Sequence, residues 1–201
     1  PLGMGREFFE PPAEESVEQV RAELQLPEEY ILTVGTIEPR KNLARLLEAY
    51  ARVKAELGRH APALVLVGRK GWKYGEVFGE IIERGLQDDV IWTDFLPDEA
   101  VRALYAHAMV FAYVSLHEGF GLPLLEAMAA GTAVVASNCS SMPEVVGDAG
   151  RLVDPFSPDS IAKGILDVVK DNDFRGKLAA SARERALRFT WGNTARQTLE
   201  V

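Results

Sequence analysis

Cysteine is almost absent from this sequence, since Cys139 is the only one in 201 residues. A single thiol cannot form an intrachain disulfide, so we expect a reducing compartment and a small, buried role for this side chain. Long apolar runs are also missing: none approaches the roughly 20 residues that cross a bilayer, and the first residues lack a signal-peptide pattern. These absences predict a cytoplasmic protein, either soluble or peripheral at the inner face of the membrane.

Positive charge is scarce as well. The sequence has 22 Lys and Arg residues against 30 Asp and Glu residues, a net charge of −8. A nucleic-acid binder needs a surplus of cations, so we predict no nucleic-acid partner. An anionic ligand would need a locally basic site, and two basic pairs stand out, Arg40-Lys41 and Arg69-Lys70. No acidic pair has the spacing of a metal site, and we expect neither a metal nor another cofactor.

Short apolar runs alternate with helical patterns along the chain. The runs are continuous and rich in β-branched residues, which favours strands covered on both faces. Such alternation predicts an α/β fold, a Rossmann-like, doubly wound parallel sheet of about six strands with helices on both faces. The expected strands are residues 30–34, 64–67, 90–92, 110–114, 133–136 and 151–153. The expected helices are residues 17–24 with Ser16 as N-cap, 43–57, 75–84, 98–108, 123–130, 142–146, 161–169 and 174–188, then a last segment from 190 or 191.

Three glycine-containing loops should meet at one edge of this sheet. In an open α/β sheet, ligands bind outside the carboxyl ends of the strands. Residues 35–42, 68–74 and 115–122 follow the first, second and fourth expected strands, and the first two of these loops carry the basic pairs. Each signal is weak alone, and their coincidence predicts the ligand site.

Residues 117–131 hold two carboxylates eight positions apart, Glu118 and Glu126. Pro123 suits the first turn of a helix and Gly131 its end, which puts Glu118 in a loop and Glu126 on the helix. Amides at a helix start lack intrahelical partners and attract an anion. The amides expected there are those of Phe120, Gly121, Leu122 and Leu124. Because Glu126 would repel a phosphate, each carboxylate should face a hydroxyl or a developing positive charge, so the ligand should carry phosphate and sugar hydroxyls.

Arg40 and Lys41 precede the second expected helix. An isolated Arg-Lys pair is typical of a solvated turn, here with Asn42 capping the helix. Opposite the helix that starts near Pro123, the two cations could instead clamp a diphosphate from the other side. Fixed cations and amides can stabilise the charge of a departing diphosphate without a metal ion.

Residues 118–126, with 127–131 and 134–137 after them, resemble the double-glutamate motif of the retaining GT-B glycosyltransferases of family 4. Residues 34–42 are similar to that family's phosphate loop, residues 94–99 with Leu104-Tyr105 to its base-side segment, and residues 142–146 to the helix after its fifth strand. Residues 1–3 resemble its interdomain linker. The motif is long and specific, which makes a generic Rossmann domain a poor alternative.

The resemblance implies a role for each part of the site. Glu118 would lie beside the donor sugar, Glu126 would accept ribose hydroxyls, and the base would be read largely by the backbone. Many members carry an arginine where this chain has Thr36, so Arg40 would take over its role. The implied catalytic residues are Glu118, Lys41 and Arg40, with no metal ligand. The implied donor-binding residues are Gly35, Thr36, Arg40, Lys41, Gly68, Phe95, Leu96, Glu118, Gly119, Phe120, Gly121, Leu122 and Glu126.

The chain as a whole would be one half of a GT-B enzyme. Residues 1–15 would be an interdomain linker remnant, residues 16–189 the nucleotide-sugar-binding domain, and residues 190–201 a helix that packs toward the missing N-terminal, acceptor-binding domain. The full enzyme would transfer a sugar from a nucleotide-diphosphate sugar to a hydroxyl acceptor, such as a growing polysaccharide or a lipid-linked glycan. Similarity of residues 38–43 to mannosyltransferase-like members favours GDP-mannose. The isolated chain would bind the donor without turnover.

Two alternatives stay open. A GT-B sugar-nucleotide epimerase or hydrolase would act on the nucleotide sugar without an acceptor, and a non-catalytic module would bind it without chemistry. Outside the site, Trp191 is interpreted as a packing residue, and Arg183 and Arg185 as part of a solvated basic helix face.

Overall fold

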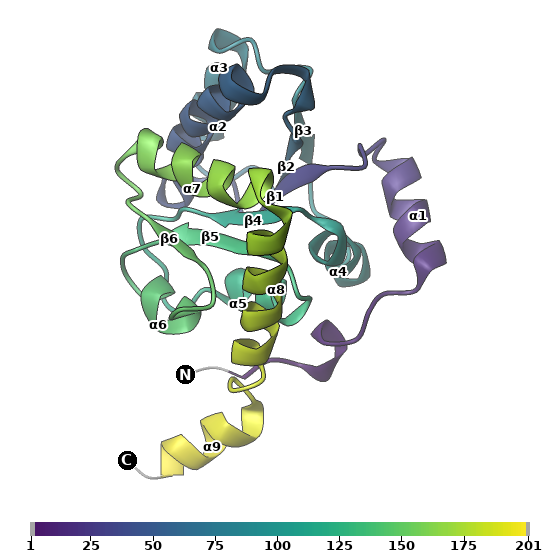
Figure 1. The fold of residues 1–201 in the computed structure, drawn as a ribbon, viewed down its shortest axis with the longest axis vertical. Helices are drawn as coiled ribbons and strands as arrows, with labels where there is room; N and C mark the ends of the chain where they lie inside the picture. Colours follow the sequence, from purple (N-terminus) through teal and green to yellow (C-terminus); the bar gives the residue numbers. More distant parts are fainter. Residues whose placement is uncertain (1–2, 200–201) are drawn as a thin grey trace.

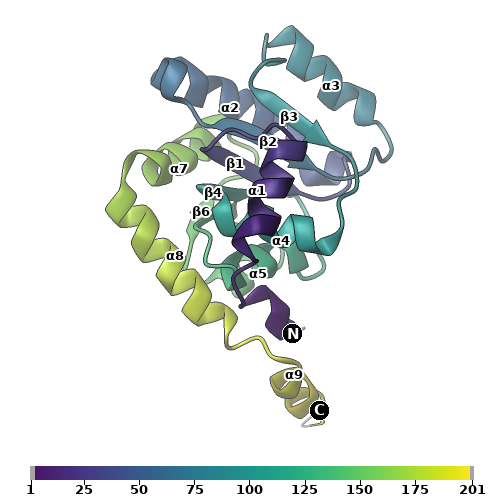
Figure 2. The same ribbon diagram turned by 90° about the vertical axis from the view of Figure 1, so that its right-hand side faces the viewer.

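The computed structural model describes residues 3–199, whose core is a sheet of six parallel strands (Figures 1 and 2). The strands are β1 (Tyr30–Val34), β2 (Ala63–Val67), β3 (Val90–Thr93), β4 (Val110–Tyr113), β5 (Val134–Ser137) and β6 (Arg151–Val153). Their order is β3-β2-β1-β4-β5-β6, and all neighbours pair in parallel. The doubly wound α/β fold predicted from the sequence is confirmed.

Helices cover both faces of the sheet (Figure 2). On one face pack α2 (Leu43–Leu57), α3 (Tyr74–Glu83) and α7 (Pro158–Lys170). On the other face pack α4 (Asp98–His107), α5 (Leu122–Ala129), α6 (Met142–Val146) and α8 (Asn172–Ala186). The remaining helices are α1 (Glu14–Glu23), which contacts α4, the short 3-10 turns η1 (Arg6–Phe8), η2 (Pro39–Lys41) and η3 (Gly58–His60), and α9 (Trp191–Leu199).

Alternate residues of each strand serve the two faces. In β4, Val110 and Ala112 belong to the core under α2 and α7, whereas Phe111 and Tyr113 belong to the core under α4 and α5. All four side chains are buried, which is why the strands appear in the sequence as continuous apolar runs. Tyr113 is the last residue of β4, so its side chain lies at the carboxyl end of the strand.

The strand order reverses between β1 and β4. From β1 the chain runs outward through β2 to β3, and from β4 it runs the other way through β5 to β6. A crevice forms outside the carboxyl ends of the strands at such a reversal, because the flanking loops diverge. The loops after β1, β2 and β4 lie there together, since these three strands are neighbours.

The start and end of α5 agree with the sequence signals. Pro123 lies in the first turn. At the other end Gly131 has a φ of +79°, its N–H donates to Met128 O at 3.0 Å, and Thr132 N–H donates to Ala127 O at 3.0 Å. This pair of bonds is a Schellman motif, which needs a left-handed residue and therefore favours glycine.

Two predictions at the chain ends are wrong. α1 begins at Glu14, ahead of Ser16, whose hydroxyl donates to Glu99 Oε1 at 3.0 Å instead of capping the helix. The acidic first turn favours this earlier start through the helix dipole. Trp191 is 58% exposed, because α9 extends away from the body in both views (Figures 1 and 2).

The basic face of α8 is not simply solvated, which is a further correction. Arg185 donates to the carbonyls of Glu144 and Val145, both at 2.6 Å, and so satisfies acceptors at the end of α6 that lack intrahelical partners. Arg183 donates to Phe9 O at 2.6 Å. These arginines connect α8 to its neighbours.

No helix within residues 3–199 is long and apolar enough to cross a membrane. The cytoplasmic location and the peripheral membrane contact stay predictions. So do the limits of the linker, the domain and the C-terminal helix, of which residues 1–2 and 200–201 lie outside the described residues.

Gly68 lies where the loops after β1 and β2 touch, with a φ of +147° and room for no Cβ, which would lie 2.1 Å from Gly35 O. We predict that Gly68→Ala lowers the free energy of unfolding by about 3 kcal/mol or more, through backbone strain and overpacking. Gly79→Ala in α3 is the matched control, because a Cβ there meets nothing within 4 Å, and it should stabilise by about 0.5–1 kcal/mol. Urea unfolding measures both; an unchanged midpoint for Gly68→Ala would contradict the prediction.

Candidate functional site

Backbone hydrogen bonds fasten together the three loops that were predicted to meet. Ile37 N–H donates to Arg69 O at 2.9 Å and joins the loops after β1 and β2, while Leu116 N–H donates to Arg40 O at 2.9 Å and joins the loop after β4. The loops therefore form one connected frame at the crevice.

The three predicted catalytic residues contact one another. Glu118 accepts from Lys41 Nζ at 2.7 Å and from Arg40 at 2.5 Å. Arg40 also donates to Glu38 at 2.6 Å and to His117 O at 2.9 Å. The Lys41 and Glu118 side chains are 10% and 9% exposed, whereas that of Arg40 is 41% exposed. The crevice thus holds a nearly buried ion pair with a more exposed second cation.

The surroundings of Glu118 keep it ionised. Burial by itself would raise the pKa of this carboxyl, but hydrogen bonds from Lys41, Ser115 and Arg40, together with the charge of Lys41, outweigh burial. The pKa of Glu118 is therefore held below its ordinary value of 4.5. At neutral pH this carboxylate suits the stabilisation of positive charge and does not suit proton donation.

Two neighbours fix the path of Lys41. Gly35 lies under the side chain with a φ of +148°, and a Cβ there would lie 2.8 Å from Lys41 Cε. At the tip, Lys41 Nζ donates to the Tyr113 hydroxyl at 3.0 Å and lies 4.9 Å from the centre of the Tyr113 ring. Tyr113 was missed by the sequence reasoning because it lies in an otherwise apolar strand.

Asn42 occupies the N-cap position of α2, as one interpretation of its loop predicted, but its side chain forms no capping hydrogen bond. It is buried and left-handed, with φ 60°, and its side-chain amide donates to Val114 O at 3.0 Å and to Pro155 O at 2.8 Å. These bonds anchor the loop after β1 to the loops after β4 and β6. The left-handed conformation, which asparagine tolerates, turns the chain sharply at this point. Asn42 therefore positions the Arg40-Lys41 pair.

The start of α5 leaves several backbone amides without an acceptor. Gly121 has a φ of +93°, and within residues 3–199 no acceptor binds the N–H groups of Gly119, Phe120, Gly121 and Leu122. The amide of Leu124, predicted to be free, instead donates to Gly121 O at 3.0 Å, because the first turn tightens around the proline. The anion-binding character of the helix start is retained.

Hydroxyls from the loop after β5 hold the Glu118 loop in place. Ser140 Oγ accepts from Glu118 N–H at 3.1 Å and donates to Glu118 O at 2.8 Å. Ser141 Oγ donates to Phe120 O at 3.0 Å. The sequence reasoning missed both serines, although their place directly after a predicted strand, at the carboxyl edge, was an available signal.

A cavity of about 410 Å³ adjoins this cluster. Phe95 at its rim is 59% exposed, and the Arg69 guanidinium lies 4.5 Å from the centre of its ring. Arg69, from the second basic pair, and Asp98, from the segment that resembles the base side, also line the cavity, although neither was among the donor-binding residues implied by the resemblance. The predicted donor-binding residues that line it are Gly35, Thr36, Gly68, Phe95, Leu96 and Glu126. Residues from four different loops and helices are thereby brought to one place.

Glu126 differs electrostatically from Glu118. Burial raises the pKa of Glu126, the hydrogen bond from Tyr105 lowers it, the nearby Asp98 charge raises it, and the net direction is upward. Tyr105 donates to Glu126 Oε2 at 3.0 Å, and no cation among residues 3–199 forms an ion pair with this carboxyl. Glu126 is therefore suited to accept hydrogen bonds from neutral hydroxyls.

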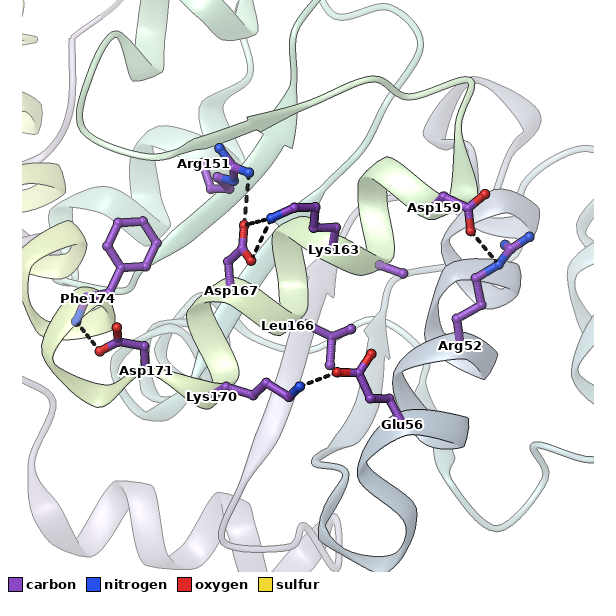
Figure 3. A pocket seen from close by; sticks show the side chains of 11 residues that line it. Arg52, Glu56, Arg151, Asp159, Lys163, Leu166, Asp167, Lys170, Asp171 and Phe174 are labelled. Atoms are coloured by element: carbon purple, nitrogen blue, oxygen red, sulfur yellow. Dashed lines mark hydrogen bonds and ion pairs between the residues drawn. The ribbon is translucent and has the colours of Figure 1, made fainter.

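A separate hollow of about 750 Å³ lies between α2 and α7 (Figure 3). Its charged side chains bind one another, as Figure 3 shows for Arg52 with Asp159 at 3.0 Å and Arg151 with Asp167 at 2.9 Å. None of the predicted site residues lines it, so we place the candidate site at the crevice. Across residues 3–199 no group of three His, Cys, Asp or Glu side chains could hold a metal ion.

The two glutamates should affect stability with opposite signs. The lowered pKa of Glu118 contributes to the stability of the fold above pH 4.5, and this contribution is lost as the pH falls through the lowered pKa. The raised pKa of Glu126 contributes to stability below pH 4.5, and this contribution is lost as the pH rises through the raised pKa. We predict that at pH 7 Glu118→Gln lowers stability by about 3 kcal/mol, since it breaks a buried ion pair.

Glu126→Gln, the matched isosteric change, should raise the melting temperature at pH 7. The difference for Glu126→Gln should shrink as the pH is lowered toward about 3, where a carboxyl with a raised pKa is neutral. The difference for Glu118→Gln should persist there and shrink only when the pH falls through the lowered pKa of Glu118. Calorimetry across this pH range measures them. Shifts of the same sign at pH 7 would contradict the assignment.

Comparison with known proteins agrees with this geometry. Residues 16–185 match the family model described as glycosyl transferases group 1. The chain is 43% identical over 173 residues to O-antigen chain mannosyltransferase B of Escherichia coli. The matched region covers 86% of this chain and 45% of that protein. The chain thus spans about half the length of this curated relative.

Solved structures share the fold. A sucrose-phosphate synthase from Thermosynechococcus elongatus superposes with a TM-score of 0.84 at 29% identity, covering 100% of this chain and 50% of that one. The C-terminal domain of a glycosyl transferase group 1 family protein from Francisella tularensis superposes with a TM-score of 0.78 at 25% identity, covering 92% of this chain and 97% of that one. The chain therefore belongs to the glycosyl transferases group 1 family and has the fold of its C-terminal GT-B domain.

Proposed function

We propose that the full-length protein is a retaining glycosyltransferase of family 4 that transfers a sugar from a nucleotide-diphosphate sugar to a hydroxyl of a glycan or lipid-linked acceptor. This chain supplies the donor half of the active site. The observation that carries the proposal is the meeting, at the sheet reversal, of the Lys41, Arg40 and Glu118 cluster with the cavity below Glu126. Gly35 borders both and makes them one continuous surface.

The diphosphate binds between the two cations and the start of α5. Lys41 and Arg40 approach from the loop after β1, and the free amides of residues 119–122 approach from the other side. Cations and helix-start amides together bind a diphosphate without a metal ion. The ribose lies in the cavity and donates to Glu126, which has no cation as a competing partner among the described residues.

The reaction begins when the bond between the anomeric carbon and the diphosphate breaks, and the leaving oxygen keeps the electron pair. Lys41, Arg40 and the amides stabilise the charge that develops on the diphosphate. The sugar becomes an oxocarbenium-like cation, which the ionised Glu118 stabilises. The acceptor hydroxyl then attacks from the face that the diphosphate left, which retains the configuration, and its proton passes to the departing diphosphate.

GDP-mannose is our preferred donor. Residues 38–43 resemble mannosyltransferase-like members, and the relatives include, besides the O-antigen chain mannosyltransferase, a serotype-specific mannosyltransferase of Escherichia coli that is 35% identical over 187 residues, covering 92% of this chain and 23% of that protein. A growing polysaccharide is accordingly the preferred acceptor. It would bind to the rest of the full-length protein.

Isothermal titration of this chain with GDP, UDP and ADP tests the proposal. We expect binding, tightest for GDP, and a loss of about 10-fold or more in affinity for Lys41→Ala and for Glu126→Ala, because each removes a hydrogen bond to a charged group. Lys163→Ala, in the hollow of Figure 3, is the matched lysine control and should leave affinity unchanged. No heat with any of the three nucleotides would count decisively against donor binding.

Turnover should require the other half of the enzyme. We predict no measurable release of GDP when the 201-residue chain is incubated with GDP-mannose, with or without mannose oligosaccharides. An enzyme-coupled assay for GDP measures this, with the full-length protein as positive control. Release of GDP without an acceptor would instead support the hydrolase alternative, and formation of an epimeric nucleotide sugar would support the epimerase alternative.

A further inference from the structure

Two buried tyrosines each hold one of the charged groups of the donor site. The Tyr113 hydroxyl accepts from Lys41 Nζ at 3.0 Å, and the Tyr105 hydroxyl donates to Glu126 Oε2 at 3.0 Å. Tyr113 is 2% exposed and Tyr105 is 0% exposed. Each phenol thus uses the hydrogen-bonding role, acceptor or donor, that its charged partner requires.

The two tyrosines belong to one aromatic stack on the same face of the sheet. The ring of Phe111 lies between them, 5.2 Å from Tyr105 in an edge-to-face contact and 5.6 Å from Tyr113 in a stacked one. Phe111 is itself fully buried. Rings packed in this way have little freedom, so both hydroxyls have fixed positions relative to each other and to the sheet.

Both phenols stay neutral under ordinary conditions. Burial is the main cause that raises the pKa of Tyr105 and of Tyr113 above their ordinary value of 10.0, with nearby carboxylates adding to it. A neutral hydroxyl can hold Lys41 without neutralising its charge. Glu118, in contrast, competes with a phosphate for the same cation.

The contacts leave hydrogen-bonding capacity for a ligand. A lysine ammonium has three donors, and within the described residues Lys41 uses one on Glu118 and one on Tyr113. Glu126 accepts from Tyr105 through Oε2, and among residues 3–199 no donor binds its Oε1. The tyrosines therefore orient each group while one position remains open.

We propose that Tyr113 and Tyr105 are positioning residues that act through Lys41 and Glu126, respectively, and preset the phosphate half and the ribose half of the donor site. The inference rests on the donor binding proposed above. Neither tyrosine touches the donor. The hydrogen bond to Tyr113 orders the flexible Lys41 side chain before the donor binds. Without the Tyr113 hydroxyl, Lys41 would lose that conformational entropy on binding, which would lower the affinity.

Titration with GDP and with guanosine, which lacks phosphates, separates the two roles. Tyr113→Phe and Tyr105→Phe remove one hydroxyl each and keep the stacked rings. Tyr113→Phe should weaken GDP about 3- to 10-fold and leave guanosine unchanged, whereas Tyr105→Phe should weaken both ligands by a similar factor, as expected for one lost hydrogen bond. Tyr50→Phe is the matched control, because Tyr50 is also buried and donates to Pro62 O at 2.9 Å, away from the crevice.

Double-mutant cycles distinguish positioning from a purely structural role. Tyr113→Phe should cause no further loss of GDP affinity in a Lys41→Ala background. In a Glu126→Ala background it should lower the affinity by the same factor as in the unaltered chain. Tyr105→Phe should show the reverse pattern. A general loosening of the core would reduce affinity equally in both backgrounds.

The outcomes are separable. If the unaltered chain binds GDP but Tyr113→Phe retains full affinity, weakens guanosine equally, or is additive with Lys41→Ala, the positioning role of Tyr113 is overturned and donor binding stands. Additivity of Tyr105→Phe with Glu126→Ala overturns the role of Tyr105 in the same way. If the unaltered chain binds no nucleotide, both proposals fail.

Discussion

The candidate site depends on the ion pair between Lys41 and Glu118, which joins two loops 77 residues apart in sequence. Two charges at about 10% exposure are costly to desolvate, and the pair is favourable only where further polar groups surround it. Tyr113, Arg40 and the Glu118 loop provide these groups. Much of the local backbone then follows: Gly35 makes room for the lysine, and Asn42 turns the chain that carries it.

The two glutamates of one motif have been given unlike properties by their neighbours. Glu118 faces two cations and is held ionised, whereas Glu126 faces a phenol and the cavity at the crevice, and its pKa moves the other way. A carboxylate beside a developing sugar cation must carry its charge, and one that accepts ribose hydroxyls needs only its lone pairs. The surrounding residues thus give two identical side chains different electrostatic properties, which suit the different roles proposed for them.

The chain is acidic overall, yet the cations Arg40 and Lys41 lie together at the carboxyl edge of the sheet. A net charge of −8 disfavours nonspecific binding of anions, while the strand reversal brings the cations of the first loop into contact with Glu118, in the loop that leads into α5. An anionic donor would therefore be bound at the crevice and repelled elsewhere. The chain spans about half of its curated relative.

The sequence by itself determined the alternation of buried strands and helices, the boundaries of α5 through Pro123 and Gly131, and the motif that marks the family. These features depend on local chemistry, on backbone preference and on periodic burial, all of which are present in short segments. Only the tertiary structure decided that Arg40 and Lys41 bind Glu118, that Asn42 anchors a loop, and that Tyr113, Tyr105, Ser140 and Ser141 support the site. Their partners lie on other strands and loops, and a polar tip in a buried segment gives no sign of its partner until the sheet order brings the two together.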